Sequence, residues 1–286
     1  MALAPARVLE LIDLRFQSRD CEIAAYLVET TDGPALFDCG PATTIAALEA
    51  GLEAHGLALT DLRHLLLSHI HLDHAGAAGE LVRRHPGLTV WVSEVGARHL
   101  ADPSRLEASA RQLFPDFDTL WGSLTPVPQD RIRAAAGEAV GWQVIPSPGH
   151  ASHHVCYLRD GTLLAGDACG VRILPRHAIQ PVSPPPDIDV EAWARTIDEI
   201  ERWQPERLAL IHFGIATDVA AHLAGLRAEL ATWSERVRSG MSEEEFVAAV
   251  SADVGPDAER YGAVFGFAMS WKGLRRYWDR RAATGG

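Results

Sequence analysis

Apolar residues recur along the chain in two patterns, short runs typical of β-strands and longer stretches with the spacing of helices. The short runs predict strands at residues 21–29, 35–38, 63–67, 89–92, 142–145, 155–158, 162–164 and 207–211. The longer stretches predict helices at residues 43–55, 190–203, 218–238, 242–250 and 257–281. Two β-rich blocks with helices at their borders predict a layered α/β architecture.

Two segments interrupt these patterns. Residues 101–133 combine several prolines with the aromatic residues Phe114, Phe117 and Trp121, and residues 180–189 contain four prolines. Proline removes a backbone donor and disfavours helix interiors, so both segments are expected to be extended or irregular. Loops of this length in an enzyme are commonly lids or binding loops, and we expect residues 101–133 to form a lid. The alternative is a surface insertion without a function.

Composition narrows the possible partners. The net charge of −12 argues against a nucleic-acid or anionic-membrane partner, because a phosphate surface requires a basic face. No stretch approaches the roughly 18 uninterrupted apolar residues of a membrane span, and the first residues lack the pattern of a signal peptide. The four cysteines stand singly, which favours a reducing cytoplasm. The partner is therefore expected to be a small-molecule substrate, and the oligomeric state is left open.

The segment from Ser68 to His74 concentrates side chains that bind metals. It contains His69, His71, Asp73 and His74, four such groups in six positions, directly after a short apolar strand. His69 and His71 share one side of an extended segment because side chains alternate with a period of two. Asp73 and His74 follow around the turn and can face a second ion. Imidazole and carboxylate donors suit zinc, iron or manganese.

Three further candidates lie at the ends of predicted strands. His150 follows Gly149, Asp167 follows Gly166, and His212 ends the last apolar run of the second block. Gly149 is expected to let the backbone approach an ion closely. Strand ends that meet at one edge of a sheet are where binding sites are assembled.

These motifs occur in a familiar order. The pattern His-x-His-x-Asp-His at residues 69–74, followed by His150, Asp167 and His212, resembles the metallo-β-lactamase fold hydrolases. The similarity is greatest to the glyoxalase II-like branch and covers roughly residues 23–214. It implies a four-layer αββα sandwich in a metal-hydrolase domain of residues 1–215. Residues 216–286 would then form a C-terminal helical extension packed on the same domain.

The resemblance also implies a role for each residue. His69, His71 and His150 would bind one metal ion, Asp73, His74 and His212 would bind the other, and Asp167 would bridge the two. Two further residues match positions beside the ligands, Asp38 and His154. Asp38 would orient a ligand imidazole; the alternative is that it stabilises the turn before Gly40. His154 would support the site without binding metal, and its neighbour His153 would face away from it.

The implied reaction is hydrolysis by a metal-bound hydroxide. Two divalent ions, zinc in the first instance and iron or manganese as alternatives, would lower the pKa of a shared water from about 15.7 towards about 7. The hydroxide would attack a carbonyl, with Asp73 as the catalytic residue that orients it. A thioester, a lactone or a carboxylic ester of a small molecule fits this chemistry. Glyoxalase II activity itself is disfavoured, because Lys272 is the only lysine and the loop of residues 172–176 is a poor substitute for a basic cluster.

One alternative belongs to a different class of enzyme. Mono-iron oxidoreductases of the persulfide dioxygenase type share this fold and resemble the chain at His69, His71, His150 and Asp167. They do not require a second complete set of ligands, which Asp73, His74 and His212 supply here. The completeness of that second set therefore favours the hydrolase.

Overall fold

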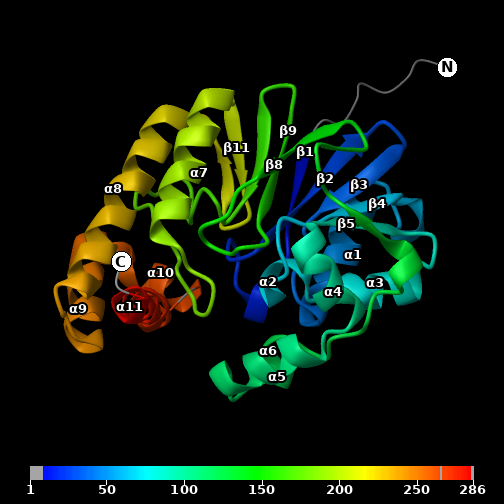
Figure 1. The fold of residues 1–286 in the computed structure, drawn as a ribbon. Coiled ribbons are helices and arrows are strands. Elements are labelled where there is room, and N and C mark those ends of the chain that lie inside the picture. Colours follow the sequence, from blue (N-terminus) through cyan, green and yellow to red (C-terminus); the bar gives the residue numbers. More distant parts are fainter. Residues whose placement is uncertain (1–8, 265, 285–286) are drawn as a thin grey trace.

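Two mixed β-sheets face each other at the centre of the molecule (Figure 1), in a computed structural model that describes residues 9–264 and 266–284. The first sheet contains, in spatial order, β1 (Leu9–Asp13), β2 (Ala24–Thr30), β3 (Gly33–Phe37), β4 (His64–Leu66), β5 (Thr89–Val92) and β6 (Ile132–Ala134). The second contains, in spatial order, β12 (Gly214–Ala216), β11 (Arg207–Leu210), β10 (Thr162–Gly166), β9 (Val155–Arg159), β8 (Trp142–Pro146) and β7 (Glu138–Ala139).

Helices cover the outer faces of both sheets. The first sheet is flanked by α1 (Ile45–Ala54), α3 (Ala78–Arg84) and α4 (Glu94–Ala101), and the second by α7 (Val190–Trp203) and α8 (Val219–Arg238). Leu48 of α1 is buried in the same core as the first sheet, and Trp193 of α7 packs with Leu208 of the second. The predicted αββα sandwich is confirmed.

Two buried tyrosines link the sheets beside the segments that carry the predicted ligands. The hydroxyl of Tyr26 donates to the carbonyl of Leu210 at 2.8 Å, and that of Tyr157 donates to the carbonyl of Leu67 at 2.9 Å. Leu210 comes just before His212 and Leu67 just before His69. A buried carbonyl is costly to leave without a partner, so these bonds fix the two sheets relative to each other where the ligand segments begin.

The C-terminal region differs in part from its prediction. After α8 come α9 (Glu243–Val254), α10 (Ala258–Val264) and α11 (Phe267–Thr284). The prediction of a single helix over 257–281 is therefore wrong, because the chain forms two helices that are separated at position 266. Position 265 lies outside the described residues. The division lets Phe267 pack against Trp233 of α8, with ring centroids 6.3 Å apart.

The prolines of segment 101–133 suggested an extended loop, but the segment is partly helical. It contains α5 (Ser104–Leu113) and α6 (Phe117–Leu120). Pro103 occupies the N-cap of α5, where its missing N–H is not needed, and Pro115 lies between the two helices. Trp121 stacks on Phe16 at 5.3 Å between ring centroids and so attaches the segment to the body of the molecule.

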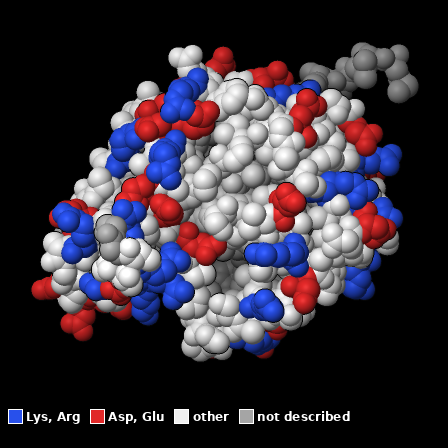
Figure 2. All heavy atoms as spheres, viewed as in Figure 1, with Lys and Arg blue, Asp and Glu red and all other residues white. Residues whose placement is uncertain are grey.

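On the face in Figure 2, basic and acidic side chains are interspersed. No helix among residues 9–264 and 266–284 has the length and apolar character needed to cross a membrane. All four cysteines are free.

Candidate metal centre

The directions of the strands bring the downstream candidates to one edge. β10 runs parallel to β11, and β8 and β10 are both antiparallel to β9, so β8, β10 and β11 run the same way. Their carboxyl ends therefore lie at the same edge of the second sheet, and His150, Asp167 and His212 each follow one of these ends. The segment after β4 of the first sheet supplies His69, His71, Asp73 and His74 to the same place.

The seven predicted ligands form two adjacent groups. One contains His69, His71 and His150, and the other contains Asp73, His74, Asp167 and His212. Within each group, one nitrogen or oxygen atom per residue lies within 4.8 Å of all the others. Every member is buried except His71, which is half-buried.

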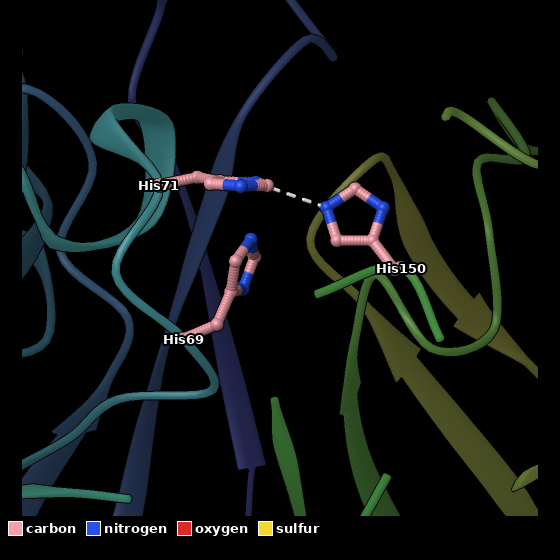
Figure 3. A group of neighbouring side chains, drawn as sticks. All are labelled: His69, His71 and His150. Atoms are coloured by element: carbon pink, nitrogen blue, oxygen red, sulfur yellow. Dashed lines mark hydrogen bonds between the residues drawn. The ribbon is translucent and has the colours of Figure 1, made fainter. Parts of the chain in front are cut away.

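In the first group, three imidazole rings converge from two loops (Figure 3). Nε2 of His150 lies 3.0 Å from Nδ1 of His71 and 3.4 Å from Oδ2 of Asp167. Nε2 of His69 is buried and makes no hydrogen bond with any described residue. An orphaned buried nitrogen is costly, which indicates that this atom faces a ligand.

In the second group, the donor atoms have nearly equal separations. Nε2 of His74 lies 3.5 Å from Oδ2 of Asp73 and 3.3 Å from Oδ1 of Asp167. Nε2 of His212 lies 3.4 Å and 3.5 Å from the same two oxygens, and 3.4 Å from Nε2 of His74. Oδ1 of Asp167 makes no hydrogen bond with a described residue.

This spacing has a simple geometric interpretation. Ligands of a tetrahedral ion at about 2.1 Å from it are separated from one another by about 3.4 Å. The five separations given for the second group range from 3.3 to 3.5 Å. Hydrogen bonds between such atoms would be shorter, near 2.9 Å. The residues of the second group therefore fit a divalent metal ion.

A second layer of hydrogen bonds directs the imidazoles. Asp38, buried at the end of β3, lies with Oδ2 2.8 Å from Nδ1 of His74, which turns Nε2 towards the group. Ser68 donates its backbone N–H to Oδ1 and its hydroxyl to Oδ2 of Asp38, both at 2.7 Å. The same hydroxyl oxygen lies 2.9 Å from Nδ1 of His69. When this Nδ1 carries the proton, Nε2 of His69 is left as a free acceptor.

Backbone carbonyls orient two further imidazoles. Nδ1 of His150 donates to the carbonyl of Val182 at 2.8 Å, and Nδ1 of His212 donates to the carbonyl of Glu22 at 2.6 Å. Both bonds fix the tautomer in which Nε2 is the acceptor, as in metal-binding histidines generally. Ser68, Val182 and Glu22 were not predicted. The carbonyls of Val182 and Glu22 lie far along the chain from the imidazoles that they bind and leave no sequence signal.

At His69, His71 and Asp73 the surroundings favour the protonation states that bind metals. Burial and the neighbouring imidazoles lower the pKa of His69 and of His71 well below the usual value, so both are neutral. Burial raises the pKa of Asp73, but His74 and His212 lower it by more, so the pKa lies well below its usual value and the carboxylate stays ionised. Neutral imidazoles and ionised carboxylates are the forms in which these side chains bind metal.

His154 supports the site from outside both groups. Its Nε2 accepts the backbone N–H of Asp167 at 3.1 Å, and its Nδ1 lies 2.8 Å from the hydroxyl of Ser147. The expectation that His153 faces away is wrong, because both histidines lie in a turn before β9 and do not alternate as in a strand. The ring of His153 stacks on that of His69 at 5.9 Å between centroids.

Two glycines beside the ligands have different roles. Gly149 has a φ of 143°, and a Cβ on it would lie 2.3 Å from Cα of Trp193. This glycine therefore admits helix α7, and its close approach to an ion stays a prediction. Gly214 has a φ of 103°, which permits the turn after His212.

A cavity of about 330 Å³ opens beside the two groups, and Figure 2 shows the surface hollowed between α11 and the helices of segment 101–133. On one side it is lined by His71, Asp73, His150 and Asp167. Opposite walls come from α5, from the prolines of residues 184–186 and from α11. Such a volume is within the range of small-molecule sites.

The aromatic and basic residues singled out in the sequence take different places. Phe114 and Trp121 line the cavity, whereas Phe117 is buried and does not. Arg172 and Arg176 form ion pairs outside it, with Asp218 and Asp257, both at 2.7 Å. Lys272 is a cavity-lining residue.

Comparison with known proteins agrees with this architecture. The sequence model of the metallo-beta-lactamase superfamily matches residues 18–212, more than half of the chain, and the chain belongs to this superfamily. The metallo-beta-lactamase fold-containing protein ST1585 of Sulfurisphaera tokodaii is 25% identical over 192 residues, which cover 63% of this chain and 72% of that protein. Its crystal structure superposes with a TM-score of 0.70 at 21% identity, over 95% of this chain and 99% of that one.

Other matches are less extensive. The structure of TTHA1623 in a di-iron-bound form has a TM-score of 0.55 at 25% identity, over 71% of this chain and 93% of that one. Thioesterase pkgB of Emericella nidulans is 27% identical over 146 residues, 50% of this chain and 34% of that enzyme. A hydroxyacylglutathione hydrolase of Methylobacillus flagellatus is 30% identical over 118 residues, 41% of this chain and 36% of that enzyme. The chain thus spans about a third of the length of these two enzymes.

Proposed function

We propose that the chain is a dinuclear-metal hydrolase that cleaves a thioester, a lactone or a carboxylic ester of a small molecule. His69, His71 and His150 would hold one ion, and Asp73, His74 and His212 would hold the other. Asp167 could serve both, since Oδ1 lies among the donors of the second group and Oδ2 lies 3.4 Å from Nε2 of His150 of the first. The observation that carries the proposal is the near-tetrahedral spacing of the second group beside a cavity that four of the seven ligands line.

The bound ions supply the chemistry that the side chains lack: they lower the pKa of a water molecule towards about 7 and polarise a carbonyl. Asp73 lines the cavity as an ionised carboxylate and can orient the attacking water by accepting its hydrogen bond. Asp38 and Ser68 keep the imidazoles of His74 and His69 in position. The apolar cavity walls hold the substrate and exclude other water.

The choice of substrate and metal rests on chemistry and similarity. Partial similarity to thioesterase pkgB and to a hydroxyacylglutathione hydrolase supports a thioester or ester substrate, and the latter also supports the glyoxalase II-like branch. Nitrogen and carboxylate donors in tetrahedral array suit zinc. Iron is the alternative to which the di-iron form of TTHA1623 points, and manganese is a further one.

A panel of thioesters, lactones, aryl esters and phosphodiesters, assayed with metal-reconstituted protein, tests the proposal. We expect hydrolysis of at least one member of the first three classes and none by His71→Ala. The second candidate, a mono-iron oxidoreductase, is disfavoured by the completeness of the second group. Absence of all hydrolysis together with oxygen uptake on glutathione persulfide would overturn the hydrolase in its favour.

A further inference from the structure

Apart from the metal ligands, one charged side chain lines the cavity, that of Lys272. Lys272 lies on α11, outside the residues that match the superfamily model. It is the only lysine among the 26 basic residues of the chain. The superfamily motifs therefore assign it no role.

The rest of the lining away from the ligands is uncharged. Apart from Ser109, it consists of apolar residues and glycine: Leu72, Leu106, Ala110, Leu113, Phe114, Trp121, Val182, Pro184, Pro185, Pro186, Gly266, Ala268 and Met269. A hydrocarbon or aromatic portion of a substrate fits these walls, because burial of apolar surface contributes about 25 cal/mol per Å². A substrate charge far from the metal ions has Lys272 as its one available counter-charge among the described lining residues.

Lys272 is available for such a contact. It is exposed and makes no hydrogen bond or ion pair with any other described residue. Two other basic residues of the same helix form ion pairs, Arg275 with Asp279 and Arg281 with Glu191. A lysine can lay its apolar stem along a wall and present a compact ammonium group at the end.

We propose that Lys272 determines specificity by binding an anionic group of the substrate. The substrate is then an ester or thioester whose apolar part fills the cavity, whose carbonyl lies at the metal side and whose carboxylate or phosphate reaches Lys272. This inference rests on the proposed function and narrows it to anionic amphipathic substrates. It gives α11 a direct part in substrate choice.

Three matched substrates test the proposal with zinc-loaded protein. Monophenyl adipate carries a terminal carboxylate, the phenyl ester of 6-phosphooxyhexanoic acid carries a terminal phosphate, and methyl phenyl adipate is neutral. We expect Lys272→Met to lower kcat/KM at least about tenfold for one or both anionic esters, mainly through KM. The neutral ester should change by less than about threefold, and Lys272→Arg should retain the preference for the anionic ester.

Arg276→Met is the matched control. Arg276 lies one turn after Lys272 on α11 and does not line the cavity, so this variant removes the same charge outside the proposed site. It should leave all three substrates unchanged. Equal losses on charged and neutral esters in Lys272→Met, or equal effects of the two variants, would overturn the proposal. The anionic ester whose kcat/KM falls in Lys272→Met identifies the bound group as a carboxylate or a phosphate.

Calorimetric titration separates this inference from the proposed function. Zinc-loaded protein should bind octanesulfonate more tightly than octanol, and Lys272→Met should abolish the difference. If no ester is hydrolysed but this difference is present and depends on Lys272, the hydrolase proposal fails and the anion site stands. If esters are hydrolysed and Lys272→Met binds both ligands as the unaltered protein does, the anion site fails and the hydrolase stands.

Discussion

The two halves of the candidate metal centre differ in chemistry and in access. The first group consists of three imidazoles, and two of them, those of His71 and His150, line the cavity. The second group contains two carboxylates, and its imidazoles, those of His74 and His212, are fully buried and do not line the cavity. Both halves therefore reach the cavity, the first through imidazoles and the second through the carboxylates of Asp73 and Asp167.

The two halves also differ in how they are held. His74 is fixed by the buried carboxylate of Asp38, and three carboxylates, Asp167, Asp73 and Asp38, act on it. Burial alone lowers the pKa of His74, but these charges raise it well above its usual value. In the first group, a carbonyl and a hydroxyl direct His150 and His69 instead. The comparison teaches that negative charge is concentrated in the half whose imidazoles lie away from the cavity and whose carboxylates line it.

Removal of both ions should have the largest effect. A chelator should reduce hydrolysis by at least about a thousandfold, or ~4 kcal/mol in the activation barrier, because the cavity offers no other activator of water. Reconstitution with zinc, iron or manganese in separate samples should restore activity and identify the most effective metal. Metal-free protein that retains full turnover, as verified by elemental analysis, would refute both halves as metal sites.

Substitution of one histidine in each half should distinguish the contributions of the two ions. His212→Ala should lose the second ion, keep the first and hydrolyse at least about a hundredfold more slowly. His71→Ala is its counterpart in the first group and should lose the first ion instead. Mass spectrometric metal analysis and circular dichroism of both variants measure metal content and folding. If His212→Ala keeps its metal content and turnover, the centre has one functional ion, and the oxidoreductase gains support.

A smaller effect is expected from the outer support of the second half. Asp38→Asn removes the charge that faces His74 and should weaken the binding of the second ion about tenfold to a hundredfold. Excess metal should restore turnover, which titration with a competing chelator can follow. Asp116→Asn, at an exposed position, is the control. Unchanged metal affinity in Asp38→Asn would favour the alternative that this residue only stabilises its turn.

The smallest effect should come from the apolar wall of the cavity. The ring of Phe114 lines the cavity and packs edge-on against Trp121, with centroids 5.2 Å apart. Phe114→Ala should raise KM for long-chain esters by up to about tenfold and leave acetate esters and metal content unchanged. Val95→Ala, on the exposed surface, is the control. Equal losses for short and long esters would show that this wall does not select substrates by the length of their acyl chain.

Much of the fold could be predicted because the strongest sequence signals are local. Strand β5 and helix α7 have the predicted bounds, 89–92 and 190–203. Asp189 caps the N-terminus of α7, because its side chain accepts the N–H of Ala192 at 2.8 Å. The buried residues of α7 recur at helical spacing. The grouping of the seven ligands was predicted by resemblance, because the motif keeps them in order along the chain.

Other features could not be predicted because they depend on contacts between distant segments. Helix α5 has a short apolar face, with Leu106, Ala110 and Leu113 at helical spacing, but the proline-rich flanks suggested a loop. Short strands such as β7 and β12 are defined by their neighbours across the sheet. The carbonyl of Glu22 reaches His212 across 190 positions, and no residue type marks such an acceptor.

Anomalous diffraction from metal-reconstituted crystals, recorded at the absorption edge of the metal, tests the two-ion centre most directly. Two peaks are predicted, one at about 2.0–2.2 Å from donor atoms of His69, His71 and His150, the other at that distance from donors of Asp73, His74 and His212. Asp167 should lie within the same distance of one or both. A single peak, or two peaks of which one lies outside these groups, would contradict the account.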